Sequence, residues 1–180
     1  MSLNKKTDRI IEDYCNKFVN IDRQRSFLLE AVYNAEFGTK HYSKALFLVG
    51  KPGIEMLSFI ECMVNLYSEI GYLKKTNKHI VVISECIFDE TKIINEADTV
   101  YANGESLLLV ICGSILEKYL RLIITLAEKE LPLLCVLLSS EQWQEIICID
   151  YGIKTHYEMF SFDFYSVDEN GRDFESYNSD

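Results

Sequence analysis

The chain has 180 residues, of which 48% are apolar and 26% are charged, the composition of one ordinary globular domain. Its 18 basic and 28 acidic residues give a net charge of −10, which argues against nucleic acid or an anionic membrane as the main partner. The N-terminus is polar, and no apolar run approaches the roughly 20 residues that span a bilayer. We therefore expect a cytoplasmic protein.

The first predicted elements are two helices within residues 7–36. Apolar residues recur there at helical spacing with charged residues between them. Thr7 is the predicted N-cap of the first helix, and Asn20 the predicted break between the two.

From residue 45 onward, predicted strands and helices alternate. The strands are predicted over 45–50, 79–84, 106–111, 133–138 and 159–164, and the helices over 54–70, 88–102, 114–130 and 141–147. The middle strands are continuous apolar runs, which is typical of parallel strands covered by helices on both faces. The fifth strand alternates Phe160, Phe162 and Phe164 with polar residues, so we expect it at the sheet edge. This pattern predicts a three-layer α/β fold with a five-stranded, mainly parallel sheet.

The pattern divides the chain into three segments. Residues 1–40 are expected to form a helical segment that packs on the core, residues 41–168 the α/β domain, and residues 169–180 a polar, acidic tail.

The six cysteines show neither a C-x-x-C pair nor the spacing of a zinc site. Most of them lie in apolar runs, so we interpret them as small buried hydrophobic residues in a reducing compartment. Cys112 could also be a reactive thiol at a strand end, but burial is the favoured interpretation. The even number of cysteines permits disulfides, which a reducing compartment disfavours.

The turn after the first predicted strand has the context of a phosphate-binding loop, a strand that ends in glycine and runs into a helix. Such a loop needs the pattern G-x-x-x-x-G-K-[ST]. Counted from Gly50, the last three positions hold Glu55, Met56 and Leu57, and Lys51 comes too early. A carboxylate at position 55 would repel phosphate. On this motif alone, a degenerate phosphate loop and an ordinary βα turn are equally good interpretations.

Other segments carry a resemblance to a known family. The chain keeps Pro52-Gly53 in the loop, Tyr-Ser-Glu-Ile-Gly-Tyr-Leu at 67–73, and Tyr-Ser-Val-Asp-Glu at 165–169. With these marks, residues 44–169 resemble the AAA+ ATPase domains of stage V sporulation protein K and the red-type rubisco activases. The resemblance implies a P-loop NTPase-like fold, the AAA+ large subdomain. The family's small helical lid should follow residue 169, where only residues 170–180 remain, so we expect no lid.

The same resemblance implies that the catalytic residues are replaced. The family reads GNPGTGKT where this chain has Gly-Lys-Pro-Gly-Ile-Glu-Met-Leu at 50–57. The acidic pair that ends the family's Walker B strand falls on Ile111 and Cys112, and the arginine finger falls on His156. Lys154 offers a charge near that finger but not a planar fork. We therefore expect neither ATP nor magnesium as a cofactor.

Three hypotheses for function follow. The first is a catalytically inactive AAA+-like domain that binds protein, as an assembly partner of an active ATPase subunit or domain or as a recruiting module. The second is a nucleotide-binding module or ATPase that uses non-standard residues, with Lys51 reaching a phosphate. The third, a receiver-like domain, is discounted because the acidic residues that receivers need are missing.

The remaining polar and aromatic residues are given structural interpretations. His41, His79 and His156 are expected at the surface or in turns, because no triad pattern accompanies them. Ser140 is the predicted N-cap of the helix at 141–147. The acidic residues Glu85, Asp89 and Glu90 are interpreted as a solvated face rather than a metal site. The aromatic residues Trp143, Tyr151 and Tyr157 are interpreted either as core packing or as a patch that binds a partner.

Overall fold

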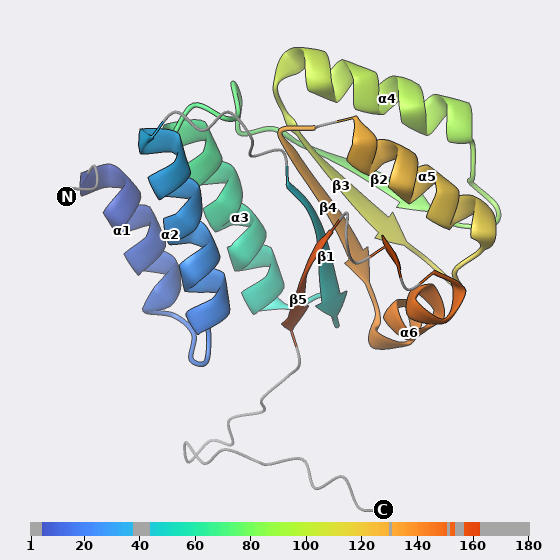
Figure 1. Cartoon of the computed structure of the whole chain (residues 1–180), viewed down its shortest axis with the longest axis horizontal. Coiled ribbons are helices and arrows are strands. Elements are labelled where there is room, and N and C mark those ends of the chain that lie inside the picture. Colours follow the sequence, from blue (N-terminus) through green and yellow to red (C-terminus); the bar gives the residue numbers. More distant parts are fainter. Residues whose placement is uncertain (1–4, 38–43, 130, 151, 154–156, 163–180) are drawn as a thin grey trace, which may run out of the picture.

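The computed structural model describes residues 5–37, 44–129, 131–150, 152–153 and 157–162. They form a five-stranded sheet between two layers of helices (Figure 1). The helices are α1 (Lys5–Cys15), α2 (Asp22–Glu36), α3 (Ile54–Glu69), α4 (Glu90–Asn103), α5 (Glu117–Glu128) and α6 (Ser140–Ile149). The strands are β1 (Lys44–Gly50), β2 (Lys78–Ile83), β3 (Ser106–Ile111), β4 (Leu133–Leu138) and β5 (Glu158–Phe162). None of the described helices is long and apolar enough to cross a membrane.

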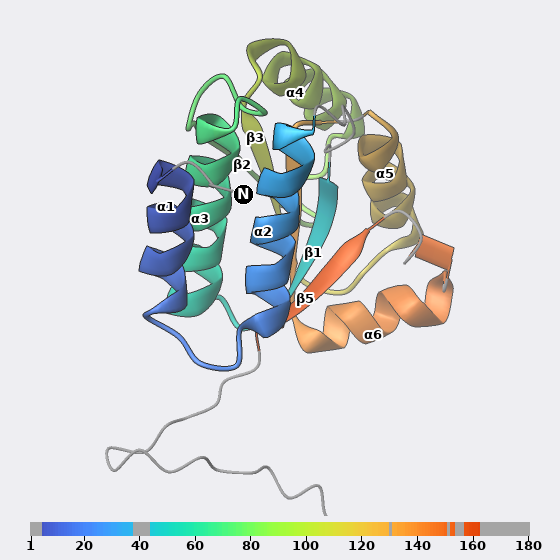
Figure 2. The same ribbon diagram turned by 60° about the vertical axis from the view of Figure 1, so that its left-hand side comes forward.

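The sheet has the strand order β2-β3-β4-β1-β5, and all four pairings are parallel. One apolar core joins α1, α2 and α3 to one face of the sheet, and a second core joins α4, α5 and α6 to the other face. Figure 2 shows the two helical layers on opposite sides of the strands. The predicted three-layer α/β fold is therefore confirmed, and β5 lies at the sheet edge as expected.

The strand order decides where a site can form. The chain leaves β1 into α3 on one face of the sheet and leaves the neighbouring β4 into α6 on the other. Ligands of open α/β sheets bind at such a switch point, beyond the carboxyl ends of the strands. A ligand site is therefore expected at the ends of β1 and β4.

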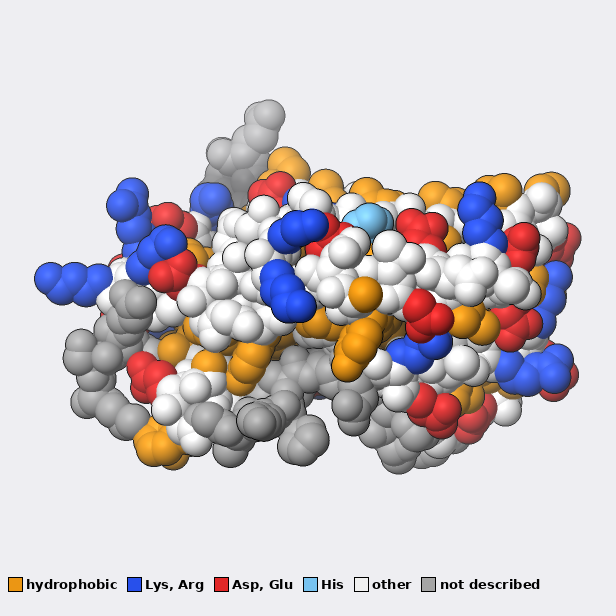
Figure 3. Space-filling model, turned by 90° about the horizontal axis from the view of Figure 1, so that it is seen from above, with side chains coloured by type: hydrophobic (Ala, Val, Ile, Leu, Met, Phe, Trp, Pro, Cys, Tyr) orange, Lys and Arg blue, Asp and Glu red, His pale blue; other side chains and the backbone are white. Residues whose placement is uncertain are grey.

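The prediction that the second strand is buried on both faces is wrong. β2 lies at the sheet edge, and Ile80 and Val82 are 62% and 43% exposed. An apolar run predicts a strand but does not tell whether a helix covers it. Seen from above in Figure 3, hydrophobic side chains reach the surface in a row along the upper rim of the molecule.

The two N-terminal helices pack against the rest of the chain through aromatic rings. The ring of Tyr14 in α1 lies 5.6 Å from that of Phe59 in α3, and the ring of Phe27 in α2 lies 5.2 Å from that of Phe160 in β5. The predicted break is confirmed, because Asn20 has a φ of 57° between the two helices. Thr7 is not the N-cap, since α1 already includes Lys5 and buries Thr7 within it.

Gly50, the last residue of β1, is in close contact with the backbone of β5. It has a φ of 138°, which side chains rarely adopt, and a Cβ atom there would lie 2.5 Å from the carbonyl oxygen of Phe162. Backbone cannot yield as a flexible side chain can. The pairing of β1 with β5 therefore requires glycine at this position.

We predict that Gly50→Ala lowers the free energy of unfolding by about 3 kcal/mol or more, because it adds a steric clash to backbone strain. Gly71→Ala is the matched control: Gly71 has a φ of 83°, but a Cβ atom there would meet nothing within 4 Å. It should cost about 1 kcal/mol. Urea unfolding of both variants measures the difference, and equal costs would contradict the role given to the Phe162 contact.

A buried carboxylate anchors the edge strand at the opposite end of the sheet. Glu105 is 2% exposed. Asn77 Nδ2 donates to its Oε1 over 2.9 Å, and His79 Nε2 lies 2.6 Å from its Oε2. Lys75 Nζ lies 3.3 Å from Oε1. Hydrogen bonds from Asn77, His79 and Lys75 lower the pKa of Glu105 to about 2. His79 therefore lies partly exposed on the edge strand, in keeping with the expected surface position, and is held there by a buried partner.

This cluster predicts a defined dependence of stability on pH. The folded pKa of Glu105, about 2, lies below its ordinary value of 4.5, so its contribution is present above about pH 4.5 and is lost as the pH falls toward 2. Glu105→Gln should remove this contribution, so the variant loses less stability than the parent between about pH 5 and pH 3. Glu128→Gln, at an exposed position in α5, should follow the parent. Urea midpoints of the three proteins, measured across this pH range, test the prediction. If the midpoints of Glu105→Gln and the parent changed with pH in parallel, the assignment of this pH dependence to Glu105 would be refuted.

Candidate functional site

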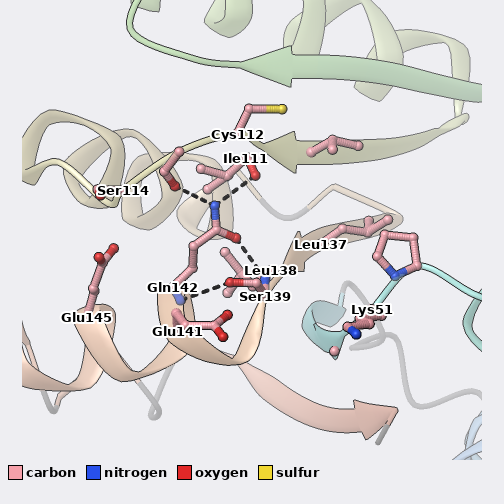
Figure 4. A pocket seen from close by; sticks show the side chains of 14 residues that line it. Lys51, Ile111, Cys112, Ser114, Leu137, Leu138, Ser139, Glu141, Gln142 and Glu145 are labelled. Atoms are coloured by element: carbon pink, nitrogen blue, oxygen red, sulfur yellow. Dashed lines mark hydrogen bonds between the residues drawn. The ribbon is translucent and has the colours of Figure 1, made fainter. Parts of the chain in front are cut away.

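A pocket of about 570 Å³ opens at the carboxyl ends of β1, β3 and β4 (Figure 4). Its walls come from residues 50–52 at the end of β1, 110–114 at the end of β3, 137–139 at the end of β4, and Glu141, Gln142 and Glu145 of α6. The pocket thus lies at the switch point of the sheet. It is the candidate functional site.

Five of the positions predicted from the sequence meet in this pocket: Gly50, Lys51, Pro52, Ile111 and Cys112. The others do not. Gly53 caps α3, and Glu55 lines a different pocket, so the expected repulsion between Glu55 and a phosphate has no basis in its position. His156 lies outside the described residues.

In the phosphate-loop pattern counted from Gly50, Met56 falls at the position of the phosphate-binding lysine, and Leu57 falls at that of the magnesium-binding hydroxyl. Met56 is 1% exposed and belongs to the core beneath α3, whereas Leu57 is 54% exposed on the outer side of the same helix. Neither side chain lines the pocket.

The turn between β1 and α3 is short. It contains Lys51, Pro52 and Gly53, and α3 already begins at Ile54, the fifth position of the phosphate-loop pattern. A phosphate loop wraps its ligand with successive backbone N–H groups. Pro52 has no N–H, as at the same position of the family's GNPGTGKT, so the turn itself offers the amides of Lys51 and Gly53, and the first N–H groups of α3 follow them.

The end of β3 presents an apolar side chain and a thiol. Ile111 is 5% exposed, whereas Cys112 is exposed and free, so the favoured prediction of a buried Cys112 is wrong. Cys86 and Cys148 are exposed too, and only Cys62 and Cys135 are fully buried among the six. Burial raises the pKa of the Cys62 thiol to about 12. All six cysteines are free.

Gln142 ties the loop after β3 to the start of α6. Its Nε2 donates to the carbonyl oxygens of Ile111 and Gly113, over 2.9 and 2.6 Å, and its Oε1 accepts from Ser139 N over 2.7 Å. Figure 4 shows this side chain reaching from α6 toward the end of β3. Ser139, not Ser140, is therefore the N-cap, and it forms a capping box with Gln142. The S-x-x-Q spacing of 139–142 is a sequence signal that could have identified it.

The charged groups at the pocket are one lysine and two glutamates. Its own backbone N–H and the Ser139 hydroxyl, with a smaller effect of Lys51, lower the pKa of Glu141. Glu145 Oε2 accepts a hydrogen bond of 2.6 Å from Ile115 N. Two carboxylates against one ammonium give a site that does not favour a polyphosphate anion.

We predict that Gln142→Leu lowers the free energy of unfolding by about 2 kcal/mol, because it leaves two carbonyls and one amide without a partner. Gln144→Leu makes the same chemical change at an exposed position of α6 and should have almost no effect. Urea midpoints of the two variants compare them directly. A Gln142→Leu midpoint as high as that of Gln144→Leu would show that the hydrogen bonds of Gln142 across the pocket do not contribute to the free energy of unfolding.

The other residues singled out by the sequence have structural roles. Asp89 is the N-cap of α4 and accepts from Lys92 N over 3.0 Å. Trp143 and Tyr157 pack against Phe47, with ring centroids 5.2 and 4.1 Å away, so core packing is the confirmed interpretation for these two. Tyr151 and His41 lie outside the described residues. Within the described ranges, no three His, Cys, Asp or Glu side chains are grouped so that they could hold a metal ion.

Comparisons with known proteins give little beyond the fold. No family model matches the chain. No curated protein matches it. A solved structure described as Rhizobiales Trip13 aligns with a TM-score of 0.46 and 14% identity, over 85% of this chain and 65% of that chain. A likeness of this degree says nothing about function.

Proposed function

We propose that this chain is an AAA+-like domain that does not hydrolyse ATP and that acts by binding protein, as an assembly partner of an active ATPase subunit or domain. The observation that carries the proposal is the three-residue turn between β1 and α3. A turn of this length is shorter than the loop of the phosphate-binding pattern, so fewer amides lie between β1 and α3 to surround a triphosphate. The finer resemblance, to stage V sporulation protein K and the red-type rubisco activases, stays a prediction.

The side chains around this turn support the same proposal. Met56 lies in the core at the position where the family's lysine would meet the phosphates. Ile111 ends β3 and Cys112 follows it, at the two positions where the resemblance puts the family's acidic pair, so neither magnesium nor an attacking water would find a carboxylate there. Each loss removes a different part of the chemistry of phosphoryl transfer.

A surface for a protein partner is available on the uncovered edge of the sheet. Ile80 and Val82 of β2 expose apolar side chains, and Ile54 and Leu57 do so on the first turns of α3. Ile80 and Val82 lie two residues apart on one face of the same strand, and neighbouring apolar side chains of this kind, unlike scattered single ones, are characteristic of surfaces that bind protein.

One observation favours the alternative, a nucleotide-binding module with non-standard residues. Lys51 lines the pocket, and its ammonium could meet a phosphate that enters there. Thermal melting with and without Mg-ATP separates the two functions. A ligand at 100 times its dissociation constant should raise the melting temperature by about 5–10 °C. We expect no shift at millimolar Mg-ATP, and a shift of that size would establish the alternative.

Restoring the lysine of the phosphate-loop pattern tests the structural reason why we expect no ATP binding. We predict that Met56→Lys does not create ATP binding and instead lowers the free energy of unfolding by about 3 kcal/mol or more, because it places a charge in the core. Leu57→Lys, one residue further at an exposed position, should change stability by less than about 0.5 kcal/mol. Mg-ATP titration and urea unfolding of both variants give the answer. Tight ATP binding by Met56→Lys would show that only the lysine is missing.

The proposed assembly with an active ATPase needs a separate experiment. If the chain assembles with an active ATPase, complexes isolated on the tagged chain from its own host should hydrolyse ATP, whereas the chain purified alone should not. Ile80→Asp with Val82→Asp, which places charges on the exposed edge, should reduce the activity that is isolated. Complexes without ATPase activity would contradict assembly with an active ATPase.

A further inference from the structure

A second pocket, of about 260 Å³, lies on the other side of the contact between Gly50 and Phe162. It is lined by Asn20, Arg23 and Gln24 at the start of α2, Glu55 of α3, and Phe160 and Phe162 of β5, among others. It shares no lining residue with the first pocket. It is therefore a separate feature of the fold, and a ligand there would be independent of the proposed function.

Two polar side chains of this pocket lack partners in the described part of the chain. Gln24 is only 6% exposed, yet its side-chain amide makes no hydrogen bond there. Glu55 is half-buried, and its carboxylate has neither an ion pair nor a hydrogen bond within the same residues. Burial raises the pKa of Glu55. Gln24 is not among the described residues whose side-chain polar atoms are fully buried and unpartnered, and Glu55 is only half-buried, so both groups are in contact with solvent and open to a ligand that enters the pocket.

A cation completes the pocket. The guanidinium of Arg23 lies 5.2 Å from the centroid of the Phe160 ring, which fixes its position by a cation–π contact. No ion pair joins Arg23 to Glu55 or to another carboxylate of the described chain. Arg23 and Glu55 thus line one pocket with opposite charges that form no ion pair within the described residues.

We propose that this pocket binds a small zwitterion of the amino-acid class. The ligand's carboxylate would meet Arg23, whose planar fork matches it, and its ammonium group would meet Glu55. The Gln24 amide at the wall of the pocket supplies a further donor and acceptor. A volume of about 260 Å³ suits a molecule of this size rather than a nucleotide.

The charges of the pocket exclude simpler ligands. A purely anionic ligand would be attracted to Arg23 but repelled by Glu55, and a cationic ligand would meet the reverse. A neutral apolar ligand would leave Gln24, Glu55 and Arg23 without partners while removing them from water. Only a ligand with both charges pairs each of the open groups.

The test is an NMR titration of the full chain with the common free L-amino acids, each compared with its N-acetylated and its amidated form. We expect at least one free amino acid to shift the amide signals of residues 20–24, 55 and 160–162 in a saturable way. Both blocked forms should bind about tenfold more weakly or worse, because each lacks one charged hydrogen bond. The proposal is overturned if no free amino acid gives a saturable shift, or if the blocked forms bind equally well.

Two variants locate the binding. Glu55→Gln should weaken the binding of the selected amino acid about tenfold or more, since the ammonium group loses its counter-charge. Glu61→Gln, at an exposed position of the same helix outside this pocket, should bind like the parent. Equal binding by the two variants would refute the assignment of Glu55. Because Glu55 is only half-buried, its replacement by Gln leaves the fold intact, which the dispersion of the NMR spectrum verifies.

Discussion

The contact between Gly50 and the backbone of Phe162 is the constraint on which both pockets depend. It brings the last residue of β1 against the last described residue of β5, with no room for a side chain between them. The chain then turns within three residues into α3. Gly50 lines the pocket at the switch point and Phe162 lines the second pocket, so this contact lies between the two. Gly50 matches the first glycine of the phosphate-loop pattern, but the pairing of β1 with β5 already requires glycine at this position.

The fold follows from the sequence because its signals are local and repeated. Apolar runs of about six residues alternate with helical periodicity, which restricts the chain to parallel strands between helices. The alternation of Phe160 and Phe162 with Ser161 marks β5 as an edge strand because one of its faces meets solvent. Asn20 marks the break between α1 and α2 because asparagine tolerates a positive φ better than most residues.

The candidate site is predicted less well from the sequence than the fold is, because the direction and burial of a side chain depend on how whole helices and strands are arranged. Counting along the motif places Glu55 at the phosphate, but the early start of α3 turns it toward α2 and β5. Cys112 follows a buried strand yet is exposed, since β3 ends one residue earlier. The same limit applies to Ile80 and Val82, where the missing information is which helix covers which strand. Arg23, Gln24 and Glu55 line one pocket although they are far apart in sequence, so no motif marks their position.

We propose that the short turn after β1 removes the phosphate cradle that a P-loop NTPase would have there. NMR spectra of the full chain, recorded while Mg-ATP is added, test it at the two turn amides that remain, those of Lys51 and Gly53. The account predicts that both signals stay in place at millimolar Mg-ATP. Saturable shifts of these two amides, together with those after β3, would contradict it and would mean that the pocket holds a nucleotide.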